Sequence, residues 1–196
     1  PHEFYRNEDD AGPNIPLMFA QVAGEERQTI ELLKDEDGLF WAPDWNFINI
    51  PYWDLTQAYQ VKVRDVDDVQ AVFNGDIIPA DADVPCEAGW NLIAYFPIYD
   101  LDASSPDFYV LSPIIDAVRL AKNGAGQFLS PEFRFSNMAD WTEGQGYQVN
   151  ITAEDGVILN YPAPQEEVAQ VQPLGSDVVV RSNANMSVLV NAISGV

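Results

Sequence analysis

The chain has 196 residues, of which 47% are hydrophobic and 12% aromatic, so it can bury a substantial core. Its 31 acidic and 9 basic residues give a formal net charge of −22, which argues against binding to nucleic acids or to anionic membrane surfaces. It contains no apolar run of about 18 residues, so we expect no membrane insertion. Fourteen prolines and twelve glycines predict many turns and few long helices.

The start of the chain and its cysteine content bear on its origin. The chain begins with Pro1 and shows no signal peptide, which we interpret as a mature or excised piece of a longer polypeptide. Its single cysteine, Cys86, cannot form an internal disulfide. We interpret Cys86 as a small buried residue rather than a reactive thiol.

The first half of the chain predicts a hairpin followed by a further strand. Residues 30–33 and 39–41 are strand-like and flank a turn at Gly38, where a positive φ is expected. Residues 57–63 alternate as a strand does, and residues 69–73 are predicted to form a closing strand.

The second half predicts a similar set of elements, preceded by one more strand. The apolar run 89–97 is typical of a central strand, and a short helix is expected around residues 114–117. The strands predicted after it are 118–121, 127–129, 145–151 and 157–161.

A shift of 88 residues aligns the two halves. Eleven of the thirty residues from 34 to 63 are identical to their counterparts, where chance gives roughly two, and this predicts an internal duplication. In the same register the run 89–97 falls on residues 1–9, which are mostly polar, so the first copy is predicted to lack its opening strand. The identical residues are Lys34, Gly38, Phe40, Pro43, Phe47, Asn49, Trp53, Gln57, Tyr59, Gln60 and Val61.

The sequence therefore predicts a mainly β protein of two tandem related β-sheet units, sandwich-like or barrel-like, with at most short helices. We assign residues 1–84 to the first unit, 85–162 to the second, 163–175 to a linker and 176–196 to a β-prone tail. We predict that this tail docks on a sheet, within its own chain or on a neighbour. Its assembly residues are predicted to be Val178, Val179, Val180, Met186, Val188, Leu189 and Val190.

Four motifs carry a resemblance to a known class of module. They are Gly-Trp-Asn-Leu-Ile at 89–93, the Lys-Asn-Gly-Ala-Gly turn at 122–126, Pro-Glu-Phe-Arg-Phe at 131–135 and Trp-Thr-Glu-Gly-Gln-Gly-Tyr-Gln-Val at 141–149. Together they resemble repeat modules of large secreted bacterial proteins exported by type IX secretion. The first copy departs from the pattern at residues 54–58. The resemblance implies an extracellular or cell-surface location and a noncatalytic spacer or adhesive role.

The residue types also limit the chemistry. His2 is the only histidine and lies at the terminus, which argues against a Ser-His-Asp triad, a Cys-His pair and ordinary zinc sites. We therefore predict that the protein is not an enzyme. A glycoside hydrolase with two carboxylates stays as an alternative, although no distinctive acidic motif supports it.

Clustered acidic residues predict a candidate calcium site. The candidate ligands are Asp35, Asp37, Asp65, Asp67 and Asp68, because calcium prefers hard oxygen ligands. The second copy has Asn-Gly-Ala at 123–125 in place of residues 35–37, so solvated turns are the competing interpretation. No other cofactor is expected.

Aromatic residues suggest a carbohydrate site. Trp41, Trp45 and Tyr52 lie close together in sequence and are predicted to be exposed rings on which a sugar face could stack. By contrast, Trp53 recurs as Trp141, as a core position of a repeat would, so we assign both to the core.

Two functions follow as hypotheses. The first is a self-assembling extracellular structural protein, in which the tail of one subunit fills the missing strand of the next and so builds filaments. The alternative is a carbohydrate-binding or adhesion module of a larger secreted protein, with polysaccharide as its partner.

Overall fold

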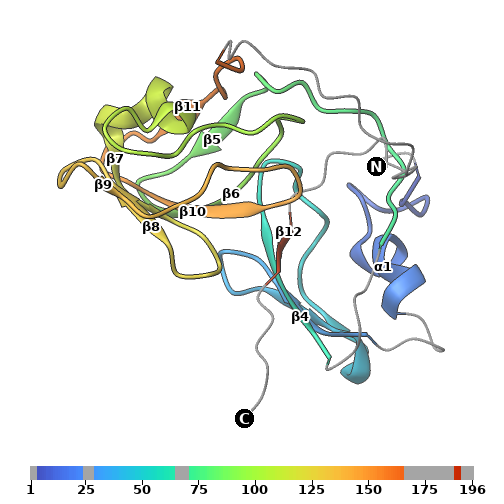
Figure 1. Cartoon of the computed structure of the whole chain (residues 1–196). Helices are drawn as coiled ribbons and strands as arrows, with labels where there is room; N and C mark the ends of the chain where they lie inside the picture. The colour runs from blue at the N-terminus through green and yellow to red at the C-terminus, as the bar shows by residue number, and fades with distance from the viewer. Residues whose placement is uncertain (1–3, 24–28, 65–70, 166–187, 191–196) are drawn as a thin grey trace, which may run out of the picture.

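The computed structural model describes residues 4–23, 29–64, 71–165 and 188–190. In these ranges the chain is mainly β, with two five-stranded sheets and one two-stranded sheet (Figure 1). The helices are short: α1 spans Ile15–Ala23, and the 3-10 helices η1 and η2 span Pro43–Trp45 and Tyr109–Ala117. The prediction of a mainly β fold with short helices is confirmed, and the expected helix near residues 114–117 lies in η2.

The first large sheet, sheet 1, has the strand order β12-β4-β1-β2-β3. Strands β1 and β2 form the predicted hairpin. Its turn contains Gly38 at a φ of 81°, a backbone angle that residues other than glycine rarely adopt. Pro43 then ends β2 and opens η1. The strand bounds are β1 Ile30–Lys34, β2 Phe40–Ala42, β3 Phe47–Ile48, β4 Tyr59–Val63 and β12 Val188–Val190.

The second large sheet, sheet 2, has the order β6-β10-β7-β8-β9, and β5 and β11 form a separate pair. All of these neighbours are antiparallel. The bounds are β5 Val84–Cys86, β6 Gly89–Ala94, β7 Val118–Lys122, β8 Phe128–Ser130, β9 Phe135–Ser136, β10 Gly146–Ile151 and β11 Val157–Leu159.

Corresponding residues of the two large sheets pair in the same way, 88 residues apart. Leu33 lies opposite Trp41 and Val61, and its counterpart Ala121 lies opposite Leu129 and Val149. Both hairpins turn through a glycine at nearly the same φ, 81° and 80°. The sheets therefore share one register as well as one strand order.

Aromatic stacks recur at the same spacing. The rings of Trp53 and Tyr59 stack at 3.9 Å between centroids, and their counterparts Trp141 and Tyr147 stack at 3.7 Å. In both pairs the tyrosine hydroxyl accepts a hydrogen bond from the backbone N–H of the residue after the tryptophan. Both tryptophans are buried, as expected for core positions.

Each large sheet has its own hydrophobic core. The buried residues of the first core come from positions 15–73 and those of the second from positions 84–161. Helix α1 contributes side chains to the first core, where Phe19 packs between Trp41 and Phe73. The helix begins after Asn14, whose side chain accepts a hydrogen bond from Leu17 N–H as an N-cap. Helix η2 supplies the second core through Val110, Leu111 and Ile114.

The two sheets meet at the outer edge of β6. Ala58 N–H donates to the carbonyl of Leu92 at 2.8 Å, and Ala94 N–H donates to the carbonyl of Thr56 at 3.0 Å. The Glu36 carboxylate, from the β1–β2 turn, accepts a 2.6 Å hydrogen bond from Leu92 N–H. The chain thus pairs with β6 at residues 56–58 and then enters sheet 1 as β4.

Two details differ from the sequence expectations. The closing strand predicted at 69–73 is wrong for residues 71–73, which form no strand, because the backbone N–H and carbonyl of Val72 bond to the Gln21 side chain instead of to a neighbouring strand. Residues 69–70 lie outside the described ranges. The boundary placed after residue 84 falls within β5, which pairs with β11. Residues 4–9 form no strand, and residues 1–3 lie outside the described ranges.

Candidate functional site

The edge of β4 is the first candidate site. In sheet 2, Tyr147, Gln148 and Val149 of β10 pair with Ile93, Leu92 and Asn91 of β6. Their counterparts in β4, residues 59–61, pair instead with β12, which comes from the far end of the chain (Figure 1). β12 therefore occupies the position in sheet 1 that β6 occupies in sheet 2.

The two completed edges differ in direction and extent. β12 runs parallel to β4 and pairs with three of its residues, whereas β6 runs antiparallel to β10 and pairs with all six of its residues. Parallel pairing is slightly less stable per residue. The β12 edge is therefore the weaker of the two, and the pairing is made within one chain. Of the predicted assembly residues, Val188, Leu189 and Val190 form β12, while Val178, Val179, Val180 and Met186 lie outside the described residues.

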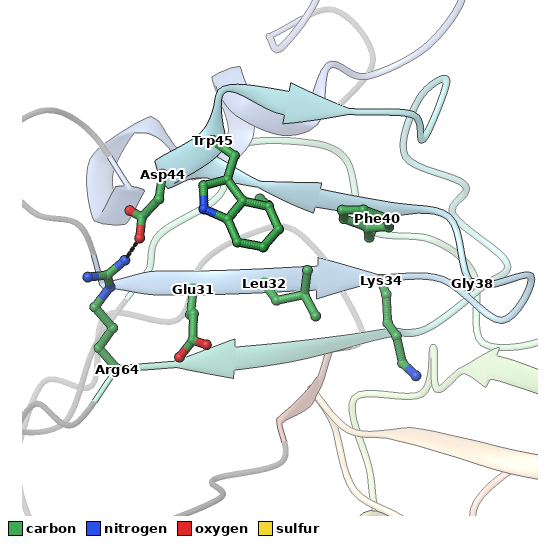
Figure 2. A pocket seen from close by; sticks show the side chains of 9 residues that line it. Glu31, Leu32, Lys34, Gly38, Phe40, Asp44, Trp45 and Arg64 are labelled. Atoms are coloured by element: carbon green, nitrogen blue, oxygen red, sulfur yellow. Dashed lines mark hydrogen bonds and ion pairs between the residues drawn. The ribbon is translucent and has the colours of Figure 1, made fainter.

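A groove on the outer face of sheet 1 is the second candidate site (Figure 2). It has a volume of about 520 Å³, within the range typical of ligand sites. Its lining comes from β1, the β1–β2 turn, β2, η1 and the residue that follows β4. The lining residues are Glu31, Leu32, Lys34, Gly38, Phe40, Ala42, Asp44, Trp45 and Arg64.

The indole of Trp45 dominates this groove. Its residue is 78% exposed, and Figure 2 shows the ring lying above the β1–β2 strands, between the Asp44–Arg64 pair and Phe40. Trp45 ends η1, and the next residue, Asn46, adopts a left-handed φ of 47° that leads into β3. Phe40 packs against Phe47 at 4.9 Å between centroids, with the two rings tilted by 35°. An exposed tryptophan above an apolar floor is a surface that a ligand can cover.

Ion pairs order the polar side of the groove. Arg64 pairs with Asp44 in the groove, and Glu31 pairs with Lys62 Nζ at 2.6 Å. The lining holds two acidic residues, Glu31 and Asp44, and two basic ones, Lys34 and Arg64, so its formal charge balances. A charge-balanced groove contrasts with the net charge of −22 on the whole chain.

The three rings predicted from the sequence do not form one site. Trp41 is only 6% exposed, because alternation along β2 turns Phe40 outward and Trp41 into the core. Tyr52 is 42% exposed but packs on Gly12, away from the groove. Only Trp45 lines it. Phe40 and Arg64 were missed, although alternation along the strands was a signal for the outward direction of Phe40.

Two of the five acidic residues predicted as calcium ligands lie in the described part of the chain. Asp35 and Asp37 lie in the β1–β2 turn, while Asp65, Asp67 and Asp68 lie outside the described residues. Asp35 accepts a hydrogen bond from Leu39 N–H at 2.8 Å, as Asn123 does from Gln127 N–H at 3.0 Å in the second unit. Across the described ranges, no three acidic, histidine or cysteine residues come together as a metal site. Closing the turn is thus a structural use for the Asp35 carboxylate.

The Glu36 carboxylate is the acidic group that joins the two sheets. Besides Leu92 N–H, it accepts a hydrogen bond from the Gln57 side chain at 3.2 Å. Partial burial raises the pKa of Glu36, and the neighbouring charges of Asp37 and Asp35 raise it further, while the hydrogen bond from Leu92 lowers it. Local sequence patterns do not indicate this contact, because its partners lie 21 and 56 residues away.

We expect Cys86 to resist alkylation in the folded protein. Its residue is 2% exposed, and burial raises the pKa of the thiol to about 12, with a smaller contribution from the charge of Glu36. Because the thiolate is the reactive species, iodoacetamide at pH 8 should label Cys86 only after denaturation. Intact-mass spectrometry with and without guanidinium checks this expectation. Rapid stoichiometric labelling of the native protein would contradict it.

No protein-family model, curated protein or solved structure was found to match the chain. Among the helices in the described part of the chain, none has the length and apolar character needed to cross a membrane. The fold and the two candidate sites therefore define a mainly β protein with a strand-completed sheet edge and an aromatic groove.

Proposed function

We propose that the protein is a noncatalytic structural protein that acts outside the cell or at its surface and self-assembles by exchanging its C-terminal strand. The observation that carries this proposal is the pairing of β12 with residues 59–61 of β4. The corresponding edge of sheet 2 is filled by β6, which is the opening strand of that same unit. In sheet 1 the same position is filled by β12, which lies near the C-terminal end of the chain.

The connection to β12 is long enough for exchange. Residues 160–187, twenty-eight in all, separate β11 from β12, and this length of chain spans up to roughly 90 Å when extended. The same β12–β4 pairing can therefore form within one chain or between two, with the same hydrogen bonds in both cases. Mutual exchange closes a dimer, whereas exchange in one direction around successive chains gives an open filament.

Protein concentration decides between the two arrangements. A covalent connection gives the intrachain pairing an effective concentration on the order of millimolar, so exchange between chains increases as the protein concentration approaches that value. The short parallel pairing helps exchange, because releasing three paired residues costs little compared with unfolding a sheet. The extracellular location and the noncatalytic role are supported by the sequence resemblance, and the noncatalytic role also by the presence of only one histidine, His2.

Assembly should depend on the backbone of β12. Leu189→Pro removes a backbone N–H and clashes with strand pairing, so this variant should stay monomeric over a concentration series in which the parent chain forms dimers or longer species. Sedimentation velocity and light scattering measure the oligomeric state of both chains from about 10 μM to about 1 mM. The upper limit is on the order of the effective intrachain concentration of β12.

Leu189→Ile is the matched control, because it keeps the N–H and the strand propensity and should assemble as the parent does. A parent chain that stays monomeric throughout the series would contradict the proposal. Oligomers that form equally well with Leu189→Pro would also contradict it, because they would use a different surface.

A further inference from the structure

We infer that the groove over β1 and β2 is a binding site for an uncharged polysaccharide, which lies across the Trp45 indole. The site does not use β12 or the β4 edge, so it is independent of the proposed assembly. It differs from the cluster expected from the sequence, because Phe40, Lys34 and Arg64 replace Trp41 and Tyr52.

The shape of the site suits a chain of sugar rings. Trp45 and Phe40 lie along one side of the groove, and Glu31 lies along the other, as Figure 2 shows. Sugar rings carry a C–H face that packs on an aromatic ring, and their rims carry hydroxyl groups. The exposed indole provides the stacking surface, and Leu32 and Ala42 provide an apolar floor beneath it.

The polar groups of the groove suit hydroxyl groups. The guanidinium of Arg64 and the carboxylate of Asp44 are held together by their ion pair, which places donors and acceptors side by side at one end of the groove. Lys34 offers a further donor at the other end. A hydroxyl group both donates and accepts, so a paired cation and anion match it better than a lone charge would.

Charge decides which class of polymer fits. The lining has two acidic and two basic residues and so presents no net charge to a ligand. The surrounding chain carries −22 and repels anionic polymers at long range. An uncharged polysaccharide experiences neither repulsion nor the cost of stripping water from a charge of its own.

The second unit supplies a matched comparison. Phe133 occupies the position that corresponds to Trp45 and is 75% exposed, but the counterparts of Glu31 and Arg64 are Arg119 and Thr152. Thr152 cannot form an ion pair with a carboxylate, so the second unit presents a ring without the adjacent paired charges. Binding should therefore depend on Trp45 and not on Phe133.

Affinity electrophoresis of the full chain in native gels tests this inference. The gels contain hydroxyethylcellulose, laminarin or glucomannan as uncharged probes, and alginate or polygalacturonate as anionic probes. We expect at least one uncharged polysaccharide to retard the parent chain, and Trp45→Ala to weaken that retardation by about tenfold or more. Phe133→Ala should migrate as the parent does, and Arg64→Gln should weaken binding while keeping some retardation.

Three outcomes would overturn the inference: no retardation by any uncharged probe, retardation by anionic probes only, or retardation that Trp45→Ala leaves unchanged. Binding of a peptide that is lost in Trp45→Ala, without retardation by any polysaccharide, would assign the groove to a peptide. This outcome would also overturn the inference. Trp45 is exposed, so its loss should leave thermal unfolding and the concentration dependence of assembly unchanged. The failure of this site is thus distinguishable from the failure of strand exchange.

Discussion

Replacing Trp141 with alanine should lower the free energy of unfolding by about 3–5 kcal/mol, as expected for the loss of a large ring from a packed core. Trp141 is fully buried, and its ring stacks on Tyr147 and meets Tyr95 and Tyr161 edge-on. Alanine would leave a cavity among three aromatic rings that cannot collapse into it without losing their own contacts. Urea denaturation followed by tyrosine fluorescence and circular dichroism measures the change.

The matched control is the same substitution at an exposed site. Trp45→Ala should change the free energy of unfolding by no more than about 0.5 kcal/mol, because Trp45 is 78% exposed. Trp141→Phe should fall between the two, since the indole N–H of Trp141 has no hydrogen-bond partner in the described structure and its loss removes packing alone. Equal effects of Trp141→Ala and Trp45→Ala would show that Trp141 is not a core residue.

Gly156→Ala should destabilise the protein by about 2–5 kcal/mol, because it combines backbone strain with a steric clash. Gly156 has a φ of 71°, and a Cβ placed there would lie 2.6 Å from the backbone carbonyl oxygen of Cys86. That oxygen belongs to β5, so relieving the clash requires moving one strand of the β5–β11 pair. Differential scanning calorimetry should show a clear fall in Tm.

Gly144→Ala separates the two causes of this effect. Gly144 has a similar φ of 79°, but a Cβ there would meet no atom within 4 Å. The free energy of unfolding of this variant should fall only by the conformational cost of a left-handed alanine, about 1–2 kcal/mol. If the two variants lost equal stability, the close approach to Cys86 would play no part.

Local patterns were enough to locate most of the strands. The β1–β2 and β7–β8 hairpins follow from strand-like runs on either side of Gly38 and Gly126, because alternation and turn chemistry depend on residues that are close in sequence. The 88-residue spacing also identified Trp53 and Trp141 as equivalent core positions, and both are buried. Helix α1 was not located in advance, since nine residues give little periodicity.

The candidate groove was only partly predictable. The sequence drew attention to Trp45, but it grouped this residue with Trp41 and Tyr52 because they are neighbours along the chain. The groove instead combines Trp45 with Arg64, nineteen positions later, because β4 and η1 both lie beside β1 in space. Such pairings depend on sheet order, which composition and periodicity do not encode.

The sequence by itself determined that a hairpin and a following strand recur 88 residues apart, and that residues 176–196 are β-prone. The tertiary structure decided how these two facts are related: β12 lies along β4, where β6 lies along β10. The physical reason is that an unpaired strand edge offers backbone donors and acceptors for pairing, and any strand of suitable length can supply their partners. The repeated strands are therefore visible in the sequence, whereas the strand that completes the edge of sheet 1 is selected only when the chain folds.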